Sequence, residues 1–195
     1  MEMDWIISIF LGIGLATAVG FRVFLPLLIL SLATHFNILP LQDSWQWVGS
    51  IPALVLLSTA TLVEICGYYI PWLDNILDTI AVPLAAVAGT AVMMATMSDM
   101  EPWITWSLAI IAGGGTAAMV AGTTSAARLT STATTAGLGN PVISTAETAV
   151  SGFVSVIAIF IPILAALLVI IILYFIVKLY KRFKRRPVDK KKVLN

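Results

Sequence analysis

Long apolar runs separated by short polar breaks make up most of the chain. They cover approximately residues 5–34, 50–70, 73–97, 103–132, 141–161 and 163–177. A helix needs about 20 apolar residues to cross a hydrocarbon core of about 30 Å, and runs of this length recur along the sequence. The pattern therefore predicts an all-α fold, a polytopic membrane helix bundle of about six crossings, in a single transmembrane domain over residues 1–177.

Two of the runs are longer than one crossing requires, and each leads into a break. The run at residues 5–34 would extend about 45 Å as one helix, at about 1.5 Å per residue, and it contains Arg22 followed by Pro26. Proline removes a backbone hydrogen bond and disfavours helical geometry at the residue before it. We therefore expect a broken or bent helix with Arg22 near the break. The alternative places Arg22 at a helix end, where it would extend to the lipid headgroups.

The second long run, residues 103–132, is rich in glycine and alanine and passes into a polar stretch, Thr124 to Glu147. Small residues allow membrane helices to approach closely, so this run should occupy the centre of the bundle. The polar stretch contains Arg128, many Ser and Thr residues and the break at Gly137–Pro141. Because lipid cannot hydrogen-bond to backbone groups, such a stretch needs protein or a water-filled cavity around it. We expect it to form half of a polar centre.

The two halves of the chain, residues 5–98 and 103–177, share an order of features. In each half a glycine-rich long run with one arginine precedes a polar break, a helix with one glutamate, an Ile-Pro pair and a closing helix. These residues are Arg22, Glu64 and Ile70-Pro71 in the first half, and Arg128, Glu147 and Ile161-Pro162 in the second. Three crossings per half would make an inverted repeat. Such repeats are typical of transporters, whose sites lie at the repeat interface near the bilayer midplane.

Composition supports the membrane assignment, and the distribution of charge predicts an orientation. Hydrophobic residues make up 59% and charged residues 11% of the chain, against roughly 25% charged residues in soluble domains. Nine of the eleven Lys and Arg lie between Lys178 and Lys192. The positive-inside rule therefore makes residues 178–195 a basic cytoplasmic tail. With six crossings, both termini would be cytoplasmic, in the cell (inner) membrane, and the loops containing Asp43 and Asp99 would be external. The tail would contact the lipid bilayer, and nucleic-acid binding is a weaker alternative.

Six ionisable residues remain inside the predicted membrane region: Arg22, Glu64, Asp74, Asp78, Arg128 and Glu147. A charge at the bilayer centre costs roughly 2.5 to 3.5 kcal/mol on insertion scales, so such residues usually face the interior in pairs or cavities. Two arginines against four acids leave an excess of carboxylates, some of which should be protonated when buried. This set suits proton-coupled movement of an anion. Ion pairs that only fix the register of the helices are an equal alternative for any single residue.

From these residues we predict substrate-binding roles for Arg22, Arg128 and Asn140, and proton-relay roles for Glu64 and Glu147. The substrate would be an anionic lipid, bound through its phosphate, or a small organic anion. Asp74 and Asp78 are four residues apart and share a helix face, where they could form a polar or cation site. The small-residue faces would also permit a homodimer without requiring one.

The segment Asp74-Asn75-x-x-Asp78 resembles the aspartate motif with which UbiA-type intramembrane prenyltransferases hold magnesium and a diphosphate. The second aspartate-rich motif of those enzymes is missing here. The simpler interpretation is that the helix dipole favours acidic residues near the start of a helix on the cytoplasmic side. His35 and Cys66 are the only His and Cys, so we expect no metal site, no cofactor and no internal disulfide.

Longer segments carry a resemblance to a known family. They are residues 20–27 (GFRVFLPL), 64–75 (EICGYYIPWLDN), 77–79 (LDT), 112–115 (AGGG) and 131–141 (STATTAGLGNP). They resemble the signature segments of a bacterial membrane family known as domain of unknown function 4126, over nearly the whole chain up to about Leu164. The resemblance implies an integral membrane protein and no particular activity. Three hypotheses stay open: a transporter, an intramembrane enzyme acting on a phosphorylated lipid, and a structural or assembly protein. We do not expect the protein to be an enzyme.

Overall fold

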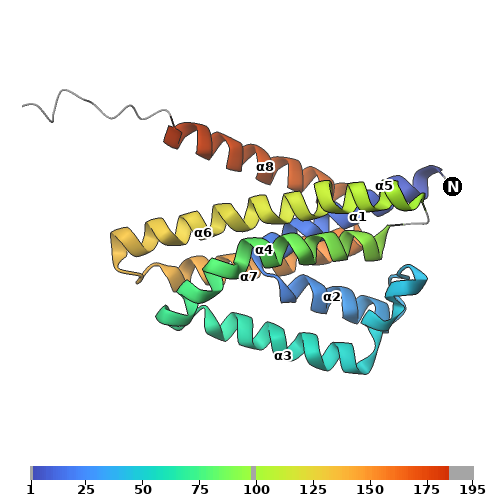
Figure 1. Ribbon diagram of the computed structural model, residues 1–195, viewed down its shortest axis with the longest axis horizontal. Helices are drawn as coiled ribbons and strands as arrows, with labels where there is room; N and C mark the ends of the chain where they lie inside the picture. Colours follow the sequence, from blue (N-terminus) through green and yellow to red (C-terminus); the bar gives the residue numbers. More distant parts are fainter. Residues whose placement is uncertain (1, 98–99, 185–195) are drawn as a thin grey trace, which may run out of the picture.

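Helices joined by short turns form the whole described structure. The computed structural model describes residues 2–97 and 100–184, and no strand occurs among them. The α-helices are α1 (Glu2–Phe21), α2 (Phe24–His35), α3 (Ile51–Gly67), α4 (Pro71–Thr96), α5 (Pro102–Leu108), α6 (Gly115–Thr135), α7 (Asn140–Phe160) and α8 (Pro162–Lys184). Two irregular helices accompany them, the 3-10 helix η1 (Asp43–Gly49) and the π-helix η2 (Ala109–Gly114). The predicted all-α fold is confirmed for this part of the chain (Figure 1).

Three helical stretches are long and apolar enough to cross a membrane: Trp72–Thr96, Pro102–Thr135 and Asn140–Phe160. A fourth results if η1 and α3, which meet at an angle of 64°, count as one broken span. The other apolar helices are shorter, over Trp5–Phe21, Phe24–His35 and Pro162–Lys178. The helices are therefore those of a membrane protein, but six crossings and an inverted repeat are not confirmed.

Helix α1 is the centre of the bundle, because it packs against α4, α6, α7 and α8. Its residues from Leu15 to Val19 are completely buried. Glycine allows this close packing, since a Cβ added at Gly20 would lie 2.5 Å from Cβ of Val120 on α6. The small-residue run at 103–132 packs on α1 and α4 through one side, while its other side is exposed. The centre is therefore α1 rather than the small-residue run.

The first apolar run does not continue through the bundle as one broken helix, but folds back on itself. The middle of α1 lies beside the end of α4, because a Cβ added at Gly12 would lie 3.1 Å from Oγ1 of Thr96. Helix α2 returns to this same end, because Gln42, in the segment that follows α2, donates a backbone hydrogen bond of 3.3 Å to the carbonyl of Ala95. Helices α1 and α2 therefore form a helical hairpin, whose tip is the break at Arg22 and Val23 (Figure 1).

The position of the break follows from the chemistry of proline. Pro26 lies in the first turn of α2, where an N–H group would have no partner within the helix, so its absence costs little. The prediction of a break near Arg22 is confirmed. Pro26 marks the beginning of the second helix rather than the break itself.

The two ends of the bundle carry different parts of the chain. The end that we call the loop end contains the start of α1 and the segment 36–50 (Figure 1). The opposite end, the tail end, contains the α3–α4 and α6–α7 turns and the last turns of α8. The described chain therefore begins and ends at opposite ends of the bundle, whereas six crossings would bring both termini to one side. Asp99 and the part of the basic tail at residues 185–195 lie outside the described residues.

Close backbone approach holds α4 against the π-helix η2. A Cβ added at Gly113 would lie 2.6 Å from the carbonyl oxygen of Gly89 on α4. Gly115, in the same helical run, is different, because the nearest atom to an added Cβ would be the carbonyl oxygen of Ile110 at 4.0 Å. The packing of α4 therefore requires the missing side chain at Gly113 but not at Gly115.

Replacing Gly113 by alanine should lower the free energy of unfolding by about 1–3 kcal/mol, because the backbone of α4 must move to admit the methyl group. The variant Gly115→Ala is the matched control, and its unfolding temperature should be close to that of the unaltered protein. Thermal unfolding of both purified variants in detergent micelles measures the difference. Equal unfolding midpoints would contradict the close contact between α4 and η2.

Candidate functional site

Arg128 on α6 lies in the interior of the bundle, with only 2% of its surface exposed. Its Nη1 lies 3.1 Å from Oδ1 of Asp74 and 3.4 Å from Oδ1 of Asp78, both on α4. Its Nη2 contacts Oε2 of Glu147 on α7, and its Nε donates to Oε1 of the same carboxylate at 3.4 Å. Arg128 therefore joins three helices, and Glu147 binds it through both oxygens.

Arg22, which directly follows α1, is 1% exposed and reaches α7. Its Nη2 donates to the backbone carbonyl of Ser144 at 2.8 Å and also contacts the hydroxyl of that residue. Its Nε donates to the hydroxyl of Thr148 at 3.0 Å. Nη2 of Arg22 also lies 3.7 Å from Oε2 of Glu147. The same carboxylate oxygen therefore faces both arginines.

Tyr68 packs against both arginines. Its ring centroid lies 4.0 Å from Cζ of Arg22 and 3.9 Å from Cζ of Arg128. A guanidinium group over an aromatic face is attracted by the electrons of the ring, by about 2 kcal/mol or more when desolvated. The sequence reasoning missed this residue. Its signal was the spacing from Glu64, since residues four apart share a helix face.

Glu64, near the end of α3, binds the break between α1 and α2. Its Oε1 accepts a hydrogen bond of 2.8 Å from the backbone N–H of Val23, and its Oε2 accepts one of 3.0 Å from that of Phe24. The first N–H groups of a helix have no partner within the helix and carry partial positive charge. The carboxylate of Glu64 therefore satisfies the start of α2, which has no side-chain cap of its own.

Asn140, the first residue of α7, connects the cluster to the α6–α7 turn. Its Nδ2 donates to Oδ2 of Asp74 at 2.8 Å and to the hydroxyl of Thr132 at 2.9 Å. The turn is made by two residues in the left-handed region, Ala136 with φ of 51° and Gly137 with φ of 85°. The glycine-containing break is thus a tight turn that places Asn140 opposite α4.

All seven sequence-predicted site residues lie in this cluster or at the helix break beside it: Arg22, Glu64, Asp74, Asp78, Arg128, Asn140 and Glu147. Asp74 and Asp78 lie near the start of α4, Asn140 begins α7, and Arg128 lies in the second half of α6, so the cluster lies toward the tail end of these helices. Among the described residues, three buried polar atoms of this set have no hydrogen-bond partner: Nη1 of Arg22, Oδ1 of Asp78 and Oδ1 of Asn140. The set also contains two more acids than arginines.

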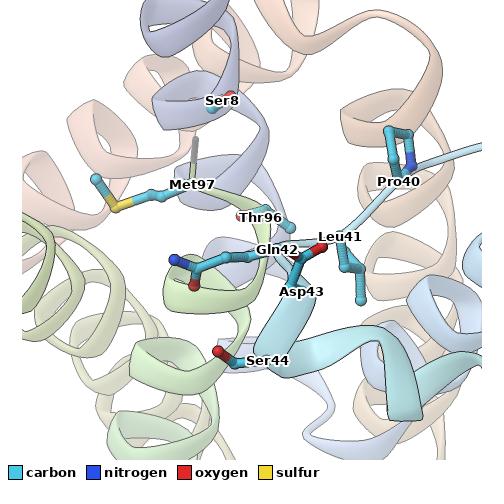
Figure 2. A pocket seen from close by; sticks show the side chains of 8 residues that line it. All are labelled: Ser8, Pro40, Leu41, Gln42, Asp43, Ser44, Thr96 and Met97. Atoms are coloured by element: carbon cyan, nitrogen blue, oxygen red, sulfur yellow. The ribbon is translucent and has the colours of Figure 1, made fainter. Parts of the chain in front are cut away.

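A separate cleft opens at the loop end. It has a volume of about 560 Å³ and is lined by the start of α1, the segment 40–44 and the end of α4. Figure 2 shows its polar side chains, among them Gln42, Asp43 and Thr96. None of the six ionisable residues of the buried cluster lines it. In the part of the chain that the structure describes, no three His, Cys, Asp or Glu side chains are placed to hold a metal ion together.

The apolar helices and the buried ion pairs define a helical membrane protein with an arginine–carboxylate cluster in its interior. The family model described as "Domain of unknown function (DUF4126)" matches residues 9–182, so the chain belongs to this family. The resemblance predicted from the sequence is confirmed. No curated protein and no solved structure matches the chain significantly.

Replacing Tyr68 by leucine should destabilise the protein by about 1–4 kcal/mol, because two cation–π contacts of about 0.5 to 2 kcal/mol each are lost. Tyr68→Phe keeps the ring and should retain most of the stability. Thermal unfolding in detergent micelles measures both. An unfolding midpoint of Tyr68→Leu equal to that of Tyr68→Phe would contradict a role for the ring in holding the arginines.

Replacing Arg128 by methionine should cost about 3–5 kcal/mol, since Asp74, Asp78 and Glu147 are left buried without their shared cation. Adding Asp78→Asn to this variant should restore part of the loss, because one unpaired carboxylate is removed. Unfolding curves of the single and double variants measure the recovery. Glu101→Gln, at the exposed residue directly before α5, is the control for removal of a carboxylate and should change the stability little. A double variant no more stable than Arg128→Met would contradict the ion pair.

Proposed function

We propose that this protein is a transporter or translocase that moves an anionic substrate, a lipid phosphate or a small organic anion, together with protons. The observation that carries the proposal is the carboxylate of Glu147, whose Oε2 faces Nη2 of both Arg22 and Arg128. A substrate anion would be recognised by the same two guanidinium groups. Glu147 therefore occupies the position that a bound anion would take.

This geometry supports a link between proton and substrate binding. A charged Glu147 attracts both arginines strongly inside the bundle, whereas a protonated Glu147 has no net charge with which to attract them. A substrate anion then replaces the carboxylate, and the proton on Glu147 keeps the total charge of the cluster unchanged. Loss of that proton drives the substrate out again. Glu64, which binds the backbone N–H of Val23 next to Arg22 in the chain, is the second proton carrier in this scheme. Asn140 contributes its amide to the binding of the substrate.

We further propose a topology of five crossings and one re-entrant hairpin. The crossings are α3, α4, the continuous run α5–η2–α6, α7 and α8, and the hairpin is α1–α2. Irregular backbone at membrane depth is tolerated where protein surrounds it. At the hairpin tip, Glu64 accepts hydrogen bonds from the backbone N–H groups of Val23 and Phe24. The basic residues after Val177 favour a cytoplasmic tail end in the inner membrane, which places the N-terminus on the opposite side. The two broken elements, α1–α2 and α6–α7, then face one cluster, as in transporters with repeats.

A structural or assembly role is the second candidate, and one observation favours it. Most charged groups of the cluster are already paired with one another, as in the contacts of Arg128 with Asp74, Asp78 and Glu147. Such pairs fix the register of helices without any ligand. The enzyme alternative lacks comparable support, because Asp74 and Asp78 both face Arg128 rather than open space.

The variant Glu147→Gln tests the proposal, since it keeps the size of the side chain and removes the proton-binding carboxylate. Protein is reconstituted in liposomes that contain a pH-sensitive dye, and inorganic phosphate, succinate or a short-chain phosphatidate is added outside. The unaltered protein should acidify the lumen when its anion is supplied. Glu147→Gln should reduce the initial rate of acidification by about tenfold or more. A tenfold lower rate corresponds to a barrier that is higher by about 1.4 kcal/mol.

Glu101→Gln is the matched control, because Glu101 is an exposed acid just before α5, which lies at the loop end (Figure 1). It should acidify the lumen at the rate of the unaltered protein. Folding of each variant is checked by its unfolding midpoint. If the correctly folded protein moves none of the three anions, or if Glu147→Gln carries protons at the full rate, the structural role becomes the better explanation.

A further inference from the structure

The tip of the α1–α2 hairpin has the chemistry of an oxyanion site. The backbone N–H groups of Val23 and Phe24 begin α2 and point to the two oxygens of one carboxylate, at 2.8 Å and 3.0 Å. Helix N-termini bind phosphate and carboxylate groups in this way, because their N–H groups are unpaired and the helix dipole favours negative charge. In this structure the oxyanion is the side chain of Glu64, on a different helix.

A second observation at the same tip points to a ligand. Arg22 directly precedes Val23 in the chain, and only 1% of its surface is exposed. Its Nη1 has no hydrogen-bond partner among the described residues. A buried guanidinium donor without a partner is unfavourable, and an additional oxygen from a ligand would satisfy it. An unused donor of a fixed positive charge therefore belongs to the residue that directly precedes the two backbone donors.

The resident carboxylate is also placed where it can leave. Glu64 belongs to α3, which packs mainly on α2 and η1 and lies at the side of the bundle rather than in the core around α1 (Figure 1). Glu147 differs in this respect, because its α7 packs directly on α1, α2 and α8. Movement of the Glu64 side chain away from α2 would empty the tip and leave Tyr68 and the central helices in place.

We propose that the hairpin tip binds the oxyanion group of the substrate, a carboxylate or a phosphate, through the N–H groups of Val23 and Phe24 and the guanidinium of Arg22, and that Glu64 is a built-in competitor for this position. A compact group with two or more oxygens fits, since both oxygens of Glu64 are used. The identification of this ligand as the transported substrate rests on the proposed function. The binding site itself does not.

Chemical rescue tests the site. Glu64→Ala removes the competitor and leaves two N–H groups without an acceptor, so this variant should unfold at a lower temperature than the unaltered protein. Formate, acetate or inorganic phosphate should raise its unfolding midpoint in a saturable manner, as a ligand of the folded state does. Potassium chloride at the same ionic strength should not. Glu101→Ala is the matched control and should show no rescue by any of these anions.

Competition tests whether the site acts in the unaltered protein. Equilibrium binding of inorganic phosphate, acetate and dioctanoyl phosphatidate is measured with the unaltered protein and with Glu64→Gln, whose neutral amide holds the tip weakly. At least one of these oxyanions should bind both proteins, and Glu64→Gln at least about tenfold more tightly, a difference of about 1.4 kcal/mol. Arg22→Lys, added to Glu64→Gln, keeps the positive charge but removes the guanidinium donors, and should weaken that binding. Preference for the phosphatidate over phosphate identifies a lipid source, and the reverse identifies a free anion.

Two results would overturn the proposal. One is a Glu64→Ala protein that responds to formate and to chloride alike. The other is a Glu64→Gln protein that binds no oxyanion more tightly than the unaltered protein, since Glu64 would then be only a helix cap. If rescue and competition are both observed but no anion moves in liposomes, the binding site is retained and the transporter is rejected. Anion movement without binding at the tip keeps the transporter and rejects the site.

Discussion

A charged side chain inside a hydrocarbon environment needs an opposite charge within the protein, and the structure around the tail end depends on this requirement. Arg128 satisfies it with acids from α4 and α7, and Arg22 satisfies it with Glu147 and the polar groups of the first turns of α7. Tyr68 brings α3 to the same place through its ring. Removal of one partner leaves the others buried and charged. The five helices that meet here, α1, α3, α4, α6 and α7, are therefore held in one mutual arrangement.

A second constraint acts on the backbone at the hairpin tip. The break between α1 and α2 leaves N–H groups without partners within the helix, and lipid could not supply acceptors for them. Glu64 supplies the acceptors from α3, so the break and α3 depend on each other. The hairpin therefore survives because another helix completes it, and a change at Glu64 acts on α2 although the two residues of the tip are far from it in the sequence.

The same contacts explain how one cluster can serve both stability and function. In the two positions where an external anion would be recognised, between the arginines and at the start of α2, the protein places a carboxylate of its own. Each internal carboxylate stabilises the arrangement of helices seen in this structure, and each is a group whose charge a proton can remove. An exchange between internal and external anions therefore needs no new binding groups, only the movement of side chains that are already present.

Much of this could be predicted from the sequence, because it depends on local or average properties. Apolar runs indicate membrane helices, Pro26 and Gly137 indicate breaks, and the cost of burying charge identified the ionisable residues that meet in the cluster. Tertiary structure alone decided that α2 turns back toward the loop end, since a break in an apolar run has no preferred direction. It also decided the partners. The spacing of Tyr68 from Glu64 indicates a shared helix face but not a ring that contacts two arginines, and Glu64 contacts N–H groups 40 and 41 residues away. Contacts of this range depend on how the helices pack, which periodicity and composition do not record.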